Sequence, residues 1–220
     1  MNLPKNKRYA IVYEDEYIII ANKPPGMLVI PTPKKETNTL TDLLNQELDS
    51  RGIVVNAYPC HRIDRDTSGL VIYAKCKSIQ AQMMEQFKKR LVKKAYLAFC
   101  HGRVSKDFDT LKGYLYNRNK NRRELMITRF RVIERKKDFT VFEVEPITGM
   151  TNQIRIQFKE IGHPLVGESL YAFRKDFRLR FKRAALHAKA IEFNHPVTGK
   201  RIRSISPLPE DMATFLKLQR

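Results

Sequence analysis

The chain has few cysteines, few glycines and no long run of apolar residues. It contains 3 cysteines, 9 glycines and 11 prolines in 220 residues, which excludes a disulfide scaffold and a collagen-like or low-complexity chain. Apolar runs such as residues 17–21 are far too short to cross a bilayer. The acidic stretch 14–16 interrupts the N-terminal apolar segment and argues against a signal peptide. We therefore expect a soluble globular protein in the cytoplasm, where thiols stay reduced.

Acidic residues are also scarce. The chain carries 42 Lys and Arg against 23 Asp and Glu, a formal net charge of +19. The excess is uneven, because residues 1–50 have a net charge of −1 and residues 51–220 a net charge of +20. So many like charges repel one another in the folded protein, which indicates that they bind a polyanionic partner. RNA or DNA is the leading candidate. An anionic membrane surface is a weaker one, because no basic amphipathic helix supports it, and a generic basic surface is the remaining alternative.

The spacing of apolar residues predicts strands and helices in no regular βαβ order. A hairpin is expected over residues 9–22, closed by a rigid turn at 22–26. Helices are expected over 39–48, from a cap at Ser78 to Leu91, and over 209–218; the segment 151–161 fits a helix or a strand. Further strands are expected at 71–74, 95–101, 109–116, 125–134, 139–146 and 186–193. This pattern predicts an α+β fold with a mixed, mainly antiparallel β-sheet and flanking helices.

Several motifs of common enzyme classes are missing. There is no GxxxxGK[ST], GxGxxG or GxSxG segment, which disfavours nucleotide hydrolysis, dinucleotide redox chemistry and an α/β-hydrolase triad. Two Cys-His pairs occur, at 60–61 and 100–101, but neighbours on a strand point to opposite faces and make poor tetrahedral ligands. We therefore expect no metal site.

Charged residues are densest in the segment His61–Gly69. Asp64 stands between Arg62 and Arg65, and these cations should lower the pKa of its carboxyl group and keep it ionised. An ionised aspartate can act as a nucleophile or an electrostatic stabiliser but is a weak general acid. The following Thr-Ser-Gly suits a tight turn. A salt-bridged surface turn is the alternative that these residues leave open.

The segment HRIDRDTSGLVIYAK, residues 61–75, closely resembles the active-site motif HRLDxxTSGLLLxAK of RluA-type pseudouridine synthases. Five more segments resemble motifs of that family in the same order. They are NKPPGMLVIP at 22–31, KAYLA at 94–98, GMTNQIR at 149–155, GHPLVGE with a tyrosine at 162–171, and LHA with FNHPVTG and PLP between 186 and 209.

This resemblance implies a pseudouridine synthase fold and an enzyme that isomerises uridine in structured RNA, either a 23S rRNA hairpin or a tRNA stem-loop, without a cofactor or metal. Asp64 matches the catalytic aspartate of the family. Tyr96 matches the tyrosine that packs on the target base, and Arg155 the arginine paired with the catalytic carboxylate. Asp64 could attack C1′ of the ribose, attack C6 of the uracil or act through a glycal route, and these alternatives stay open.

Three further residues are expected to bind substrate. Arg62 resembles an arginine that reaches into the space left by an extruded nucleotide, and Arg65 is expected to join it. Leu186 looks like the apolar residue that lines the pocket. Basic tracts at 88–94, 118–123 and 174–183 are expected to contact phosphates. Phe173, Phe177 and Phe181 accompany the last tract, and we expect them to be core residues rather than stacking platforms.

The chain departs from the family pattern at four motif positions. Asn152 stands where the family usually has His, and Glu168 where it has Asp; Ile63 replaces Leu and Pro25 replaces a common Ala. The N-terminal S4-like module of some relatives has no room before residue 22, so we expect one catalytic domain over 1–220, acting as a monomer and recognising its target by itself. The alternatives are a catalytically silent RNA-binding protein with the same fold and a nucleoside hydrolase that releases uracil.

Overall fold

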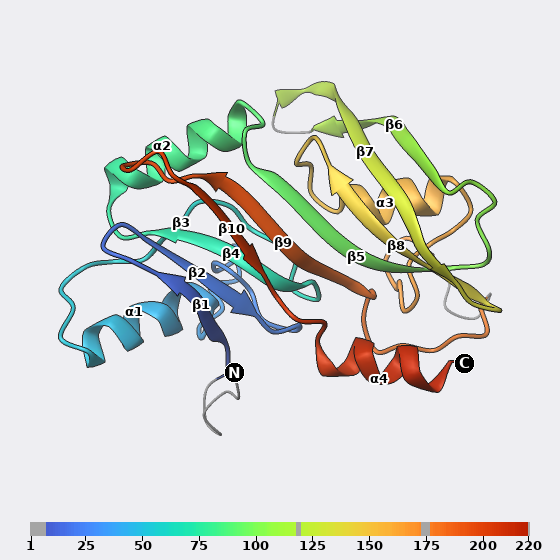
Figure 1. The fold of residues 1–220 in the computed structure, drawn as a ribbon, viewed down its shortest axis with the longest axis horizontal. Helices are drawn as coiled ribbons and strands as arrows, with labels where there is room; N and C mark the ends of the chain where they lie inside the picture. Colours follow the sequence, from blue (N-terminus) through green and yellow to red (C-terminus); the bar gives the residue numbers. More distant parts are fainter. Residues whose placement is uncertain (1–7, 118–119, 173–176, 220) are drawn as a thin grey trace. The chain divides into compact units, whose positions relative to one another are not determined.

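The computed structural model describes residues 8–117, 120–172 and 177–219 of the chain. They form two compact units: unit 1 comprises the described residues up to 93 and residues 188–207, and unit 2 the described residues within 94–187 and from 208 onward. Strands and helices occur in both (Figure 1). The registered strand pairings are antiparallel, which confirms the predicted α+β class. In the described ranges no helix is long and apolar enough to span a membrane.

The sheet of unit 1 has the strand order β1-β2-β4-β9, with β3 added to β4 and β10 to β9. Its strands are β1 (Ala10–Glu14), β2 (Ile18–Lys23), β3 (Tyr58–Pro59), β4 (Ser68–Ala74), β9 (Leu186–Asn194) and β10 (Arg201–Ile205). Every residue of β4 is buried, so both faces of this central strand are covered, as its apolar sequence requires. The two short strands β3 and β10 were not predicted, because neither has a long alternating pattern.

Two helices cover the sheet of unit 1. Helix α1 (Leu40–Ser50) begins with a capping box in which Thr39 and Asp42 satisfy each other's backbone N–H groups. Helix α2 (Lys77–Lys88) packs Ile79 and Met83 into a core shared with β2, β4 and β9. The two helices that the apolar spacing predicted, over 39–48 and after Ser78, are thus confirmed.

The predicted ends of α2 are wrong. Cys76, not Ser78, occupies the N-cap position, and its side chain makes no capping hydrogen bond. The helix ends at Lys88 because Arg90 takes a left-handed backbone conformation with φ 59°. Leu91 therefore leaves the apolar stripe and is 54% exposed. For the same reason, the basic residues after Lys88 do not share a helical face.

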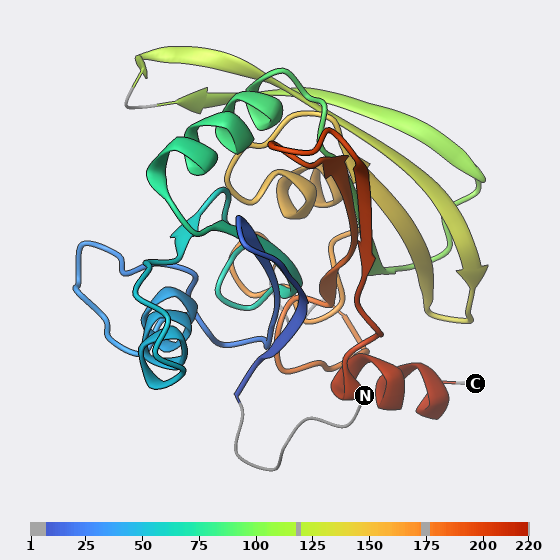
Figure 2. The same cartoon turned by 60° about the vertical axis from the view of Figure 1, so that its left-hand side comes forward.

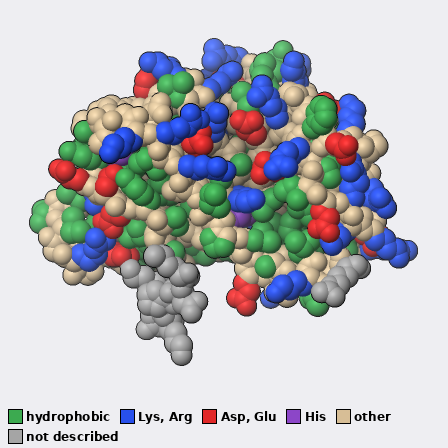
Figure 3. Space-filling view, in the orientation of Figure 1, with side chains coloured by type: hydrophobic (Ala, Val, Ile, Leu, Met, Phe, Trp, Pro, Cys, Tyr) green, Lys and Arg blue, Asp and Glu red, His purple; other side chains and the backbone are tan. Residues whose placement is uncertain are grey.

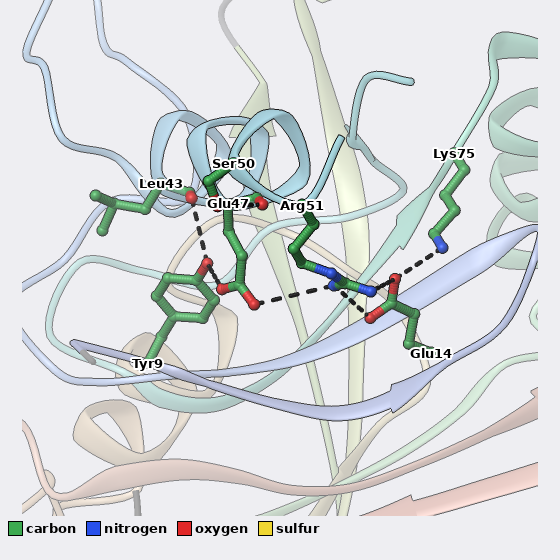
Figure 4. A network of polar contacts seen from close by, with 7 residues as sticks. All are labelled: Tyr9, Glu14, Leu43, Glu47, Ser50, Arg51 and Lys75. Carbon is green, nitrogen blue, oxygen red and sulfur yellow. Dashed lines mark hydrogen bonds and ion pairs between the residues drawn. The ribbon is translucent and has the colours of Figure 1, made fainter. Parts of the chain in front are cut away.

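A polar network fastens α1 to β1 (Figure 4). The Tyr9 hydroxyl donates to Glu47 at 2.5 Å, and Arg51 makes two hydrogen bonds to Glu14, at 2.8 and 3.0 Å. Lys75 adds a third bond to the same carboxylate, at 2.8 Å. Burial alone would raise the pKa of Glu14, but the bonds from Arg51 and Lys75 hold it below its usual value.

The sheet of unit 2 has the order β5-β8-β7-β6. Its strands are β5 (Lys93–His101), β6 (Phe108–Asn117), β7 (Arg122–Arg135) and β8 (Phe139–Pro146). Side chains of β5 and β8 alternate between two cores, because successive residues of a strand face opposite sides. Ala98 and Phe142 pack with helix α3 (Gln153–Glu160), whereas Phe99 and Val141 pack with helix α4 (Glu210–Leu218).

Helix α3 resolves the ambiguous segment 151–161. Gln153 and Gln157 are buried on the sheet side, where they bond to the hydroxyl of Thr128 and to carbonyls of the neighbouring strands. Only the folded sheet supplies these hydrogen-bond partners. A glutamine that would be expected to face solvent can therefore be buried in the core.

The basic tracts are described in part. Phe181 packs on the core of α4 beside Phe215, which confirms the expected core role for that residue. Arg183 is buried and pairs with Asp211 at 2.7 Å, so it does not belong to a phosphate-binding tract. Residues 118–119 and 173–176, which include Phe173, lie outside the described residues.

Candidate active site

Asp64 lies in the loop that joins β3 to β4 in unit 1, and both ends of this loop are held. At its start, His61 accepts a hydrogen bond from the Ile72 backbone N–H at 3.1 Å, and its ring lies 4.7 Å from that of Phe87. At its end, the Thr67 N–H donates to the Asp64 carbonyl at 3.1 Å and closes a four-residue turn. Asp64 is half-buried at the entrance to β4.

The turn therefore comes earlier than expected, because Ser68 and Gly69 already belong to β4. Gly69 has φ +115°, and a Cβ atom on it would lie 2.2 Å from the Ala188 carbonyl oxygen. No side chain fits there, since the obstacle is backbone of β9. The glycine of this motif thus serves the close approach of two strands rather than the turn.

A buried lysine holds the other side of the Asp64 loop. Lys23 has no exposed surface, and its ammonium donates to the carbonyls of Pro24, Met27 and Arg65 at 2.9, 2.7 and 2.8 Å. The Gly26 N–H also donates to the Arg65 carbonyl, at 2.9 Å. Three acceptors match the three N–H donors of an ammonium, which offsets the cost of burying the charge. Lys23 thus ties the segment 22–27 to the residue next to Asp64.

This role of Lys23 was not predicted from the sequence. A signal was present, because a lysine ends the apolar strand Ile18–Lys23 and is followed by Pro-Pro-Gly. Lysine is almost never fully buried without polar partners. A lysine in a buried strand therefore indicates that its ammonium makes hydrogen bonds inside the protein.

The two arginines that flank Asp64 are exposed. Arg65 donates to Glu36 at 2.9 Å. The pKa of Glu36 is lowered to about 2, mainly by a hydrogen bond from Thr32, with a smaller contribution from Arg65. Arg65 is thus partly engaged with the preceding loop, and substrate binding by Arg62 and Arg65 stays a prediction.

Tyr96 and Leu186 belong to one hydrophobic core in unit 2. Leu186 is buried at the start of β9, and Tyr96 in β5 is half-buried against the same cluster of side chains, which includes Ile154 of α3. In the register of the sheet Tyr96 lies opposite Val144, so its ring is on the α3 side. The structure brings these two predicted residues together within unit 2.

Arg155 of α3 is buried and held by two side chains. Its Nε and Nη2 donate to the two oxygens of Glu168, both at 2.7 Å, and Nη1 donates to Asn152 at 3.0 Å. The guanidinium also lies over the ring of Tyr171, 5.5 Å from its centre. A bidentate pair of this kind fixes the plane of the guanidinium as well as its position.

Glu168 is the acceptor that organises this group. Burial would raise the pKa of its carboxyl group, but the bonds from Arg155 and from the backbone N–H groups of Leu170 and Tyr171 lower it, so the group stays ionised. Gly167, just before it, has φ +78°, and a Cβ there would lie 2.0 Å from the Arg183 carbonyl oxygen. Only glycine can therefore bring the chain into this position.

Two of the four departures from the family pattern are partners of Arg155. Glu168 forms the ion pair, and Asn152 accepts from Arg155 while its amide donates to the Tyr171 hydroxyl at 2.9 Å. Both departures are visible in the sequence, but their common partner is not, because the three residues lie in two separate motifs.

The structure thus divides the six predicted site residues into two sets. Arg62, Asp64 and Arg65 share one loop of unit 1, whereas Tyr96, Arg155 and Leu186 lie in unit 2. A pairing of Arg155 with Asp64 stays a prediction.

Two solved structures have a fold similar to that of this chain. The structure called Human RNA Pseudouridylate Synthase Domain Containing 4 matches with a TM-score of 0.80 at 19% identity, over 94% of this chain and 92% of that chain. Human RNA Pseudouridylate Synthase Domain Containing 1 matches with a TM-score of 0.75 at 21% identity, over 100% and 98% of the two chains.

Sequence comparison agrees with the fold. Residues 17–160 match the family described as RNA pseudouridylate synthase. The uncharacterized RNA pseudouridine synthase YlyB of Bacillus subtilis is 38% identical over 94% of this chain and 71% of its own length. Ribosomal large subunit pseudouridine synthase D of Pseudomonas aeruginosa is 33% identical over 96% and 71%. The chain therefore belongs to the RluA-type RNA pseudouridine synthases, and it is an isomerase that forms pseudouridine in RNA.

Proposed function

We propose that the enzyme modifies specific uridines of structured ribosomal or transfer RNA by flipping the nucleotide out of its stack, and that Asp64 cleaves and re-forms the glycosidic bond. A net charge of +19 supports a polyanionic substrate. The relative named for the large ribosomal subunit favours ribosomal RNA. The family match at 17–160 draws on both units, so the proposal treats residues 1–220 as one catalytic domain.

The proposed reaction rearranges bonds without a change of composition. The N1–C1′ bond of uridine breaks, the uracil turns, and C1′ joins C5; C5 loses a proton and N1 gains one. Nothing is oxidised or hydrolysed. The step needs an ionised carboxylate, which acts as a nucleophile or, in a glycal route, as a base, and it needs an acceptor for the C5 proton. In the proposal Asp64 is that carboxylate, whether it attacks C1′, attacks C6 or assists a glycal route.

The observation that carries the proposal is the way the Asp64 loop is held. A reacting group must be placed to within a fraction of an ångström, which requires rigid support. Lys23 donates a hydrogen bond to the carbonyl of Arg65, the residue after Asp64. The Thr67 N–H closes the turn, and Gly69 lets β4 approach β9. An exposed salt-bridged turn would need none of these buried contacts.

The remaining site residues receive their roles from the family resemblance. The proposal assigns base stacking and proton removal to Tyr96, and stacking of this kind is worth about 1–3 kcal/mol. Leu186 would line the base-binding site, and Arg62 would fill the vacated space in the RNA. Arg155, whose plane is set by Glu168 and Asn152, would pair with Asp64 and keep it ionised.

The test uses total RNA from a strain that lacks the gene. Wild-type protein is expected to form pseudouridine at defined positions, detected by carbodiimide labelling and primer extension. Asp64→Asn keeps the shape of the side chain and removes the charge, so it is expected to bind this RNA and form no detectable pseudouridine.

Asp66→Asn is the matched control, because Asp66 lies in the same turn; it is expected to keep a rate close to wild type. Normal turnover by Asp64→Asn would overturn the role of Asp64. Release of free uracil by the wild-type protein would indicate a hydrolase, and loss only of tRNA sites in the deletion strain would exclude ribosomal RNA.

A further inference from the structure

Strands β6 and β7 form a long two-stranded ribbon at the edge of the unit 2 sheet (Figure 2). One face of the ribbon packs on the core through residues such as Leu111, Met126 and Phe130. The other face is open to solvent. Opposite residues of an antiparallel pair share a face, so the register defines this outer face. Its cross-strand pairs are Phe108–Arg131, Thr110–Arg129, Lys112–Ile127, Tyr114–Leu125 and Tyr116–Arg123.

Three aromatic rings lie on this outer face. Phe108, Tyr114 and Tyr116 are 78%, 66% and 53% exposed. Tyrosines two residues apart on one strand stand about 7 Å from each other, far enough for each ring to receive a separate base. The Tyr116 hydroxyl donates to the side chain of Asn121, which restricts the movement of its ring. Large exposed rings that share one face of a sheet are typical of a binding surface rather than of a solvated one.

Cations surround the two tyrosines. Arg123 lies directly across from Tyr116, and Lys112 is two residues from Tyr114 on the same face. Farther along the ribbon, Arg129 and Arg131 are also on this face, paired with Glu145 and Glu143 of β8 at 3.9 and 2.9 Å. Figure 3 shows Lys and Arg side chains beside hydrophobic and acidic ones on the face of the molecule that it draws.

This outer face is distinct from the face that carries Tyr96. Tyr96 lies opposite Val144, and Val144 opposite Phe130, so these three residues share the side of the sheet toward α3. Arg129 and Arg131, the neighbours of Phe130, point to the other side together with Tyr114 and Tyr116. The strand order places β6 three strand spacings from β5, or about 15 Å.

We propose that the outer face of the β6–β7 ribbon binds unpaired nucleotides of the substrate RNA, with bases stacked on Tyr114 and Tyr116 and phosphates on Lys112 and Arg123. This proposal rests on the proposed RNA substrate. Aromatic side chains on an open sheet stack bases in other RNA-binding modules, and flanking cations bind the phosphates. A protein partner is less favoured, because apolar docking surfaces are depleted of lysine and this one is flanked by cations.

The experiment measures binding of in vitro transcribed large-subunit rRNA. The variant Tyr114→Ala/Tyr116→Ala is expected to bind it at least tenfold more weakly, with the effect in KM rather than kcat. Tyr114→Phe/Tyr116→Phe is the matched control, which keeps both rings and should retain affinity if stacking is the contact. The side chains are exposed, and thermal unfolding verifies that the alanine variant is folded.

A second variant tests the phosphate contacts. Lys112→Ala/Arg123→Ala is expected to lower the slope of log affinity against log salt by about 1.4, at about 0.7 per phosphate of a single strand. If Tyr114→Ala/Tyr116→Ala binds the RNA with wild-type affinity, the proposal is wrong. This holds even if the same variant no longer binds a protein partner. If wild-type protein neither binds nor modifies the RNA, the proposed function itself fails, which is a different outcome.

Discussion

Each of the two units holds a buried cation, and the two do so in different ways. In unit 1, Lys23 gives its ammonium to three backbone carbonyls and so fixes a loop. In unit 2, Arg155 gives its guanidinium to the carboxylate of Glu168 and the amide of Asn152, and so fixes its own plane. The first arrangement positions a neighbouring residue, whereas the second positions the cation itself. They should respond differently when one partner is removed.

The largest effect is expected from breaking the ion pair of unit 2. Glu168→Ala removes the bidentate carboxylate from the buried Arg155, which should lower the free energy of unfolding by about 3–5 kcal/mol. Urea unfolding measures this loss.

The double variant Arg155→Met/Glu168→Leu separates stability from activity. Well-packed apolar residues often replace a buried ion pair without loss of stability, so this variant should recover most of the stability of the wild type. It is expected to form no pseudouridine, because the guanidinium is gone. A double variant as active as the wild type would contradict the role proposed for Arg155.

A smaller effect is expected from Lys23→Met. The substitution keeps the length of the side chain but leaves at least one carbonyl without a donor, at a cost of about 1–3 kcal/mol. Because the loop next to Asp64 is then loosely held, kcat should fall more than stability explains. Single-turnover rates measured well below the unfolding temperature test this expectation. A variant that loses stability but keeps the wild-type rate would show that Lys23 does not position the loop.

The smallest expected effect is on how the free energy of unfolding depends on pH. The pKa values of Glu168 and Glu14 lie below the ordinary value of 4.5, so each carboxylate stabilises the fold above that pH and the stability is lost as the pH falls through the lowered pKa. Between about pH 5 and pH 3, the unfolding free energy of the wild type should fall more steeply than that of Arg155→Met/Glu168→Leu. Glu14→Gln should flatten the curve less, because Arg51, one of the two partners of Glu14, is exposed and exposed pairs contribute only about 0.2–1 kcal/mol. Equal slopes for all three proteins would contradict the comparison.

Local patterns predicted most of the elements. The apolar spacing over residues 39–48 placed α1 correctly, and apolar or alternating runs located the longer strands of both units, but not the short strands β3 and β10. Predictions failed where a single backbone conformation decided the outcome. The left-handed Arg90 ended α2 early and exposed Leu91, and no spacing of apolar residues indicates such a conformation.

The candidate site shows the same division. The motif around Asp64 and its five companions identified the family, because each motif is a contiguous stretch of sequence. The partners that hold the site were not evident, because Lys23 reaches a carbonyl 42 residues away and Arg155 a carboxylate 13 residues away. Polar bonds across such separations depend on how the strands and helices pack.

By itself, the order of residues in this chain determined the class of fold, the family and the identity of the candidate catalytic residues, since these follow from local spacing and contiguous motifs. Tertiary structure alone decided which groups hold Asp64 and Arg155, and that Phe108, Tyr114 and Tyr116 lie exposed on one face of a ribbon. The physical reason is that burial and hydrogen bonding are properties of pairs of distant residues, which come together only when the chain is folded.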